Sequence, residues 1–167
     1  MKQVTLNPPS LTIREEVRPE DRIAVRDIVE STGFFSAAEA DVAVELVDER
    51  LAKGPSSGYY FVFIENEGQV LGYACFGPIA CTVHSFDLYW IAVHRDQQRM
   101  GLGLKLVELS EQAIRRMGGR RVYIETSGRE QYKPTRGFYE RCGYHEDAVM
   151  TDFYDEGDDK VVYVRKV

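Results

Sequence analysis

Residues 87–103 read DLYWIAVHRDQQRMGLG, and this stretch decides the fold. The apolar run begins near Ser85 and continues to Val93, which is typical of a strand buried at the centre of a sheet. From Leu102 to Met117, apolar residues recur three or four positions apart, which predicts an amphipathic helix. The sequence therefore predicts a central strand joined to a long helix by a glycine-containing loop.

The loop has the composition of an anion site. It reads Gln98-Arg99-Met100-Gly101-Leu102-Gly103. The first amides of a helix have no partner inside the helix, and the helix dipole adds partial positive charge there. Glycines let a phosphate approach the backbone, and Arg99 adds a full charge. The loop therefore predicts a pyrophosphate site, with a tight turn that needs two glycines as the alternative.

Periodicity and turn residues predict the elements on either side. Upstream they are a short strand starting at Leu11 and extending toward Val17, helices at 19–33 and 36–53, and a hairpin of 59–65 with 69–76. Downstream they are a strand at 122–126, a helix at 134–141, and a hairpin of 144–154 with 160–167. A right-handed parallel crossover lies in the middle of this order. We expect one α/β domain with a mixed sheet over residues 10–167, after a flexible tail at 1–9.

Composition excludes several classes of partner. The chain has 167 residues and a net charge of -6, which argues against duplex nucleic acid and against an anionic membrane surface. It contains no apolar run long enough to span a bilayer, and its first residues lack the apolar core of a signal peptide. Cys75, Cys81 and Cys142 match no disulfide framework, and Cys81 with His84 is too small a ligand set for a metal. We expect reduced thiols, a cytoplasmic location and no metal.

Three segments together resemble the signature regions of the GNAT superfamily of N-acetyltransferases. They are residues 87–93, the loop 98–103, and the run from Gly137 to Tyr144. The order of elements over residues 11–167 matches that family as well. The resemblance implies a mostly antiparallel sheet that splays at its central parallel pair, with helices on both faces. Arg95 departs from the family pattern, which often has proline there.

The resemblance also implies acetyl-CoA as co-substrate. The backbone around Ile91, Ala92 and Val93 would hold the pantetheine arm, and the loop from Gln98 to Gly103 would bind the pyrophosphate. Tyr132 and Phe138 would lie beside the cofactor.

Acetyl transfer to an amine needs a base, an oxyanion donor and an acid for the leaving thiolate. Tyr139 stands where the family's proton donor stands, with helix packing as its alternative role. Asp87 is the candidate base because a carboxylate on an apolar strand is costly unless it is functional; its alternative is an exposed acid at the start of the strand. Glu125 is the second candidate. A backbone amide near Ile91 or Ala92 would stabilise the oxyanion.

The acceptor side is less determined by sequence. Candidate walls are aromatic: Phe34, Phe35, Tyr89, Tyr132 and Phe153. The acids of the last turn, from Asp152 to Asp159, have two interpretations: a charge that attracts a cationic amine or, as is more usual for acids in a turn, a solvated surface. We expect an enzyme that acetylates a primary amine of a small molecule by direct attack in a ternary complex. A protein N-terminal or lysine acetyltransferase and an inactive acetyl-CoA sensor stay open, as does homodimer formation.

Overall fold

The computed structural model describes residues 11–167, and the tail expected at 1–9 lies outside that range. The strands are β1 (Leu11–Arg14), β2 (Tyr60–Asn66), β3 (Gln69–Pro78), β4 (Ser85–Val93), β5 (Arg121–Ser127), β6 (His145–Asp155) and β7 (Asp158–Lys166). The helices are α1 (Asp21–Ser31), α2 (Ala37–Lys53), α3 (Leu102–Arg116) and α4 (Lys133–Arg141). Three one-turn 3₁₀ helices are η1 (Gly54–Ser57), η2 (Arg95–Gln97) and η3 (Glu130–Tyr132). Every predicted helix and strand is present in the predicted order.

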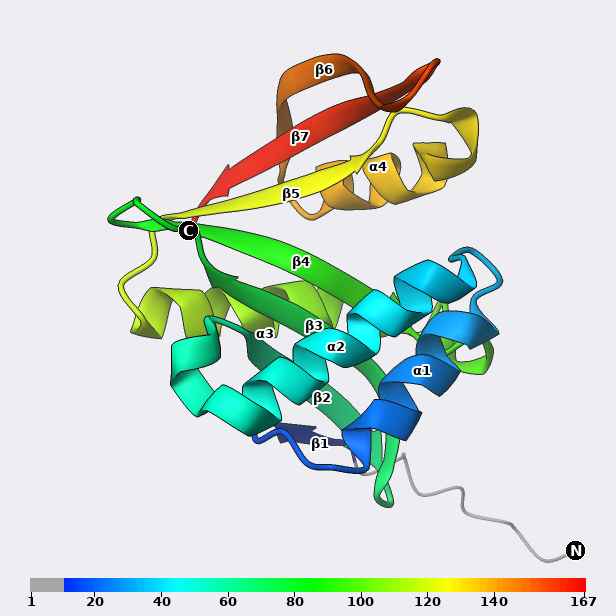
Figure 1. Ribbon diagram of the computed structural model, residues 1–167, viewed down its shortest axis with the longest axis vertical. Coiled ribbons are helices and arrows are strands. Elements are labelled where there is room, and N and C mark those ends of the chain that lie inside the picture. The colour runs from blue at the N-terminus through cyan, green and yellow to red at the C-terminus, as the bar shows by residue number, and fades with distance from the viewer. Residues whose placement is uncertain (1–10) are drawn as a thin grey trace, which may run out of the picture.

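The seven strands form one sheet in the order β1-β2-β3-β4-β5-β7-β6. Only β4 and β5 are parallel, so the expected mixed and mostly antiparallel sheet is confirmed. The pairing of β4 with β5 begins at Ser85 and ends at Asp87, which lies opposite Tyr123. Beyond Asp87 the two strands diverge, as Figure 1 shows. Among the described residues, this splay leaves one backbone edge of β4 without a strand partner.

A bulge in β4 accompanies the splay. Trp90 lies opposite Cys75 and Leu88 lies opposite Phe76, so Tyr89 is an extra residue with no counterpart on β3. A bulge bends its strand and increases the local twist. The bulge therefore helps to turn the second half of β4 away from β5.

Helices cover both faces of the sheet, as the sequence predicts (Figure 1). On one face, α1 and α2 bury Val25, Val47 and other side chains against aromatic residues of β2 and β3 such as Phe61. On the other, α3 and α4 share a second core, in which Leu106 and Ile114 are fully buried. A capping box starts α2, in which Ser36 and Glu39 are bonded reciprocally. None of the helices within residues 11–167 has the length and apolar character that crossing a bilayer requires.

The first strand is shorter than predicted, because it ends at Arg14 instead of continuing to Val17. The Arg14 guanidinium is buried between two carboxylates, with its Nη2 2.8 Å from Asp21 and 2.6 Å from Glu65. A buried guanidinium needs such partners, and reaching Asp21 at the start of α1 turns the chain out of the sheet. Val17 instead packs against the core under α1 and α2.

Candidate active site

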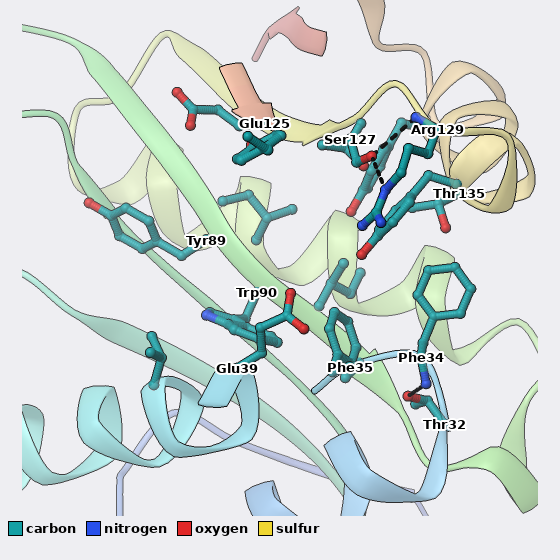
Figure 2. A pocket seen from close by; sticks show the side chains of 18 of the residues that line it. Thr32, Phe34, Phe35, Glu39, Tyr89, Trp90, Glu125, Ser127, Arg129 and Thr135 are labelled. Carbon is teal, nitrogen blue, oxygen red and sulfur yellow. Dashed lines mark hydrogen bonds between the residues drawn. The ribbon is translucent and has the colours of Figure 1, made fainter. Parts of the chain in front are cut away.

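A cleft of about 1100 Å³ opens where β4 and β5 diverge. Its walls come from the α1–α2 connection, β4, β5, the start of α4, and the β6–β7 hairpin. Figure 2 shows side chains from these elements pointing into the space between them, with Glu39 and Trp90 on one side and Glu125 and Ser127 on the other. The splay of the sheet thus creates a cavity bordered by exposed backbone.

The predicted loop between β4 and α3 has the geometry of an anion site. Arg99 and Gly101 both adopt left-handed backbone conformations, with φ values of 67° and 78°. Such alternation turns successive amides toward one point, a concavity that binds anions. Within the described residues, no carbonyl accepts a hydrogen bond from the amides of 99–104, although Lys105 does bond back to Gly101. The loop therefore presents a row of free donors at the start of α3.

Side chains fix this loop in place. The side-chain amide of Gln98 donates to the carbonyl of Val93 at 3.3 Å. The backbone amide of Arg95 donates to the Ser31 hydroxyl at 3.1 Å. A Cβ built on Gly103 would lie 3.3 Å from the ring of Phe138, so this glycine allows α4 to pack closely on α3. Of the other two loop residues, Leu102 is buried in the core and Met100 is exposed.

The second half of β4 presents its backbone to the cleft. The amide of His94 donates to Leu71 of β3 at 2.9 Å. Because successive residues of a strand point their amides and carbonyls in opposite directions, Ala92 also faces β3, whereas Ile91 and Val93 face the open edge. All three residues line the cleft, but only Ile91 and Val93 turn their backbone groups toward it, and the Val93 carbonyl also accepts a hydrogen bond from the Gln98 side chain.

Tyr139 of α4 reaches the cleft from the opposite side. Its side chain lines the cavity and is otherwise buried, with its ring centroid 5.5 Å from Phe138, 6.4 Å from Tyr144 and 6.2 Å from Tyr163. Burial raises the pKa of this phenol well above its usual value, with the nearby Cys142 as a smaller cause. The hydroxyl therefore stays protonated at neutral pH, as a proton donor must.

Asp87 lies at the point where β4 and β5 part. It is half-buried and lines the cleft, so it is not the exposed acid of the alternative interpretation. Burial, the largest cause, and the charge of Glu125 together raise its pKa to about 6, while the charge of Lys160 acts to lower it. The burial has a visible source, because the backbone of Gly58 and the ring of Tyr89 lie over Gly77, the residue opposite Asp87 on β3. A carboxyl group with this pKa exchanges protons near neutral pH.

Glu125, the second candidate base, also lines the cleft but is already paired. Its Oε2 lies 2.8 Å from the ammonium nitrogen of Lys160, a side chain that is only 11% exposed. Asp87 has no such ion-pair partner within the described residues. The structure thus brings both predicted carboxylates into one cavity but in different electrostatic states.

Aromatic side chains form much of the acceptor side, as the sequence predicts. Phe34 contacts Tyr132 with ring centroids 4.9 Å apart, which joins the α1–α2 connection to the start of α4. Phe35 packs on Trp90 at 5.1 Å (Figure 2). Phe153 is absent from the wall formed by the described residues; its ring lies under the Lys160 ammonium at 3.8 Å, and the neighbouring Tyr154 lines the cleft instead.

Sequence analysis missed three polar residues of the cleft, namely Glu39, Ser127 and Arg129, and it named Asp155 and Asp158 only among the acids of the last turn. The interpretation of the last acidic turn as solvated is wrong for Asp158, which is 6% exposed, bonds the Ser127 hydroxyl, and pairs with Arg129 at 3.0 Å. The only local signal is that Asp158 lies three positions before the apolar run from Val161 to Val164. Pairing across the sheet, which buries it, has no local signature.

The net character of the cleft is acidic. Five carboxylates line it and Arg129 is the one basic side chain among its lining residues. Within residues 11–167 no group of three or more His, Cys, Asp or Glu side chains is arranged to hold a metal ion. The arrangement offers free backbone donors, a poised carboxyl group, a buried phenol and a negatively charged aromatic chamber.

Comparison with known proteins agrees with this geometry. The model of the acetyltransferase (GNAT) family matches residues 22–144. The chain is 48% identical to a GNAT-family protein from Desulfovibrio desulfuricans, with a TM-score of 0.93 over 94% of this chain and 99% of that one. No curated protein sequence matches the chain significantly.

More distant structures share the fold alone. An aminoglycoside 6'-N-acetyltransferase complexed with coenzyme A is 16% identical, with a TM-score of 0.74 over 93% of this chain and 96% of that one. The ribosomal-protein-S18-alanine N-acetyltransferase of Escherichia coli is 19% identical, with a TM-score of 0.73 over 94% of each chain. These two proteins are named for acceptors of very different size.

Proposed function

Because the chain belongs to the GNAT family and is therefore an acetyl-CoA-dependent acetyltransferase, we propose that it acetylates a primary amine of a cationic small molecule by direct attack in a ternary complex. The observation that carries the proposal is Asp87. It is a half-buried carboxyl group with a pKa of about 6, and it lies beside the open edge of β4.

Acetyl-CoA binds along the splay in this proposal. The free amides of 99–104 bind its pyrophosphate, and the charge of Arg99 strengthens that contact. The pantetheine arm lies beside β4 and pairs with the backbone of Ile91 and Val93, as an added strand would. The thioester then lies between Asp87 and Tyr139, which border the cleft from opposite sides.

The reaction forms an amide bond and breaks a C–S bond. Asp87, directly or through water, takes a proton from the ammonium group, and the neutral nitrogen attacks the thioester carbonyl carbon. The amide of Ile91 faces the cleft and donates to the oxyanion. When the intermediate collapses, the electron pair of the C–S bond goes to sulfur, and Tyr139 gives the thiolate its proton. After the attack the nitrogen loses its second proton, which passes through water to the Tyr139 phenolate and restores the phenol. Asp87 releases the first proton to solvent, so one proton is released for each acetyl group transferred.

The cleft favours a small cationic acceptor over a peptide. Two of its five carboxylates, Glu125 and Asp158, are paired with Lys160 and Arg129, whereas Glu39, Asp87 and Asp155 have no ion-pair partner within the described residues and attract an ammonium group. Its aromatic walls suit the carbon skeleton beside that group. The contact between Phe34 and Tyr132 joins two walls of the cleft and narrows the path that an extended peptide would need. The neighbour that acts on aminoglycosides shows that this fold accommodates such acceptors in another protein.

Product analysis tests the proposal. The protein is incubated with acetyl-CoA and, separately, with small diamines, monoamines, lysine peptides and peptides with a free N-terminus. Release of free thiol matched by N-acetylated small amine supports the proposal. Preferential acetylation of peptides would replace it with a protein acetyltransferase, and binding of acetyl-CoA without any acetylated product would replace it with a sensor.

A further inference from the structure

The cleft contains two carboxylates that sequence alone does not distinguish as bases. Asp87 pairs with Tyr123 across the parallel strands, and Glu125 follows Tyr123 by two positions. Residues two apart on a strand share a face, so both carboxylates lie on the same face of the sheet. Lys160 of β7 lies opposite Ser127 of β5, and Ser127 follows Glu125 by two positions. The side chain of Lys160 therefore lies on the same face as both carboxylates. The three charged side chains therefore form a row across β4, β5 and β7.

Lys160 is held on Glu125 by several contacts. Its ammonium nitrogen is 2.8 Å from Glu125 Oε2 and 3.8 Å from the centre of the Phe153 ring. Its side chain is 11% exposed, whereas that of Glu125 is 49% exposed. A lysine this buried keeps its charge only with a partner, and Glu125 is its ion-pair partner within the described residues.

We propose that Lys160 is a positioning residue of the acetyl transfer: it holds Glu125 as a paired anion and leaves Asp87 as the carboxylate that takes the proton of the amine. The inference rests on the proposed function. It assigns different tasks to the two carboxylates, since a carboxylate already bonded to an ammonium is a poorer proton acceptor than a free one.

The other groups facing Asp87 do not replace Lys160. On β3 the opposite residue is Gly77, which contributes no side chain. On β5 the opposite residue is Tyr123, and the bulged Tyr89 lies next along β4, with Tyr59 packed against it at 5.5 Å. A phenol supplies no positive charge. Lys160 is thus the cation that offsets the charge of Glu125, and its removal exposes Asp87 to the full charge of Glu125.

Removing the positive charge of Lys160 and removing the negative charge of Glu125 should therefore shift the pKa of Asp87 in opposite directions. In Lys160→Met the uncompensated Glu125 raises the pKa of Asp87, so the acid limb of kcat/KM moves to higher pH, by on the order of one unit. In Glu125→Gln the like charge is gone, so the limb moves to lower pH while activity persists. Lys160→Arg keeps the charge and should restore the wild-type profile. The titration of the amine is the same in every variant and cannot produce these differences.

The test combines pH profiles for one amine with NMR titration of the Asp87 carboxyl carbon in the same proteins. Opposite shifts in Lys160→Met and Glu125→Gln, with Lys160→Arg unchanged, support the inference. Equal or absent shifts overturn it, and so does loss of activity at every pH in a folded Glu125→Gln protein, which would make Glu125 the base. If no variant acetylates any amine, the proposed function fails. The NMR titration still decides whether Lys160 controls the pKa of Asp87.

Discussion

Replacing Tyr139 with phenylalanine removes the hydroxyl and keeps the ring, so the variant tests the role of the hydroxyl alone. The ring is 7% exposed and packs among Phe138, Tyr144 and Tyr163, and all of these contacts survive in Tyr139→Phe. We therefore expect the free energy of unfolding to change by less than about 1 kcal/mol. Acetyl-CoA should still bind, because the loop 98–103 is untouched. Turnover should fall by about 10²- to 10⁴-fold, the usual contribution of a general acid, which corresponds to roughly 2.7–5.4 kcal/mol in the barrier.

The assay measures turnover and thermal unfolding in one preparation of Tyr139→Phe. Turnover is followed as free thiol under saturating acetyl-CoA and amine. A large loss of turnover with unchanged unfolding identifies a catalytic hydroxyl. Full activity, or a fall in activity that is explained by a fall in stability, would refute the assignment of Tyr139 as the acid and return it to a packing role.

Four further variants test other parts of the account. Gly101→Val should lose the rise in melting temperature that acetyl-CoA causes, whereas Gly118→Val, with a similar φ of 86° at the other end of α3, should keep it although both are strained by about 1–2 kcal/mol. Asp87→Asn should lower turnover most between pH 6 and the pKa of the amine, and little above that, because alkaline pH supplies neutral amine without a base. Because the pKa of Asp87 is higher in the folded protein, binding of its proton stabilises the fold at low pH, and this stabilisation is lost as pH rises through about 6. Asp87→Asn should therefore melt at a higher temperature than wild type at pH 8 but not at pH 4. Tyr73→Phe removes a buried hydroxyl that has no partner within the described residues, so denaturant unfolding should show unchanged or slightly greater stability.

Features written in local spacing were predictable from sequence. Apolar positions three or four apart define α3, and the glycines of the loop mark its start. The capping box at Ser36 and Glu39 fixes the start of α2 in the same way. The loop between β4 and α3 was predictable because an anion site at a helix start needs only a few consecutive residues.

Features set by pairing across the sheet were not predictable. The bulge at Tyr89 depends on the register of β3 against β4, and no residue type in β4 predicts it. The same holds for Lys160, whose partner Glu125 lies 35 positions earlier in the chain, on a different strand. Asp158 reads as one more acid of a surface turn, and only the fold brings Ser127 of β5 and Arg129 of the following loop to it. The identity of the candidate residues was thus available from the sequence, while their charge states came from the fold.

A crystal structure of the protein with acetyl-CoA tests the central claim most directly. We predict that the pyrophosphate accepts hydrogen bonds from the amides of 99–104, that the pantetheine arm pairs with Ile91 and Val93, and that the thioester lies between Asp87 and Tyr139. A pyrophosphate bound away from this loop, or a thioester outside the cleft between β4 and β5, would contradict the account.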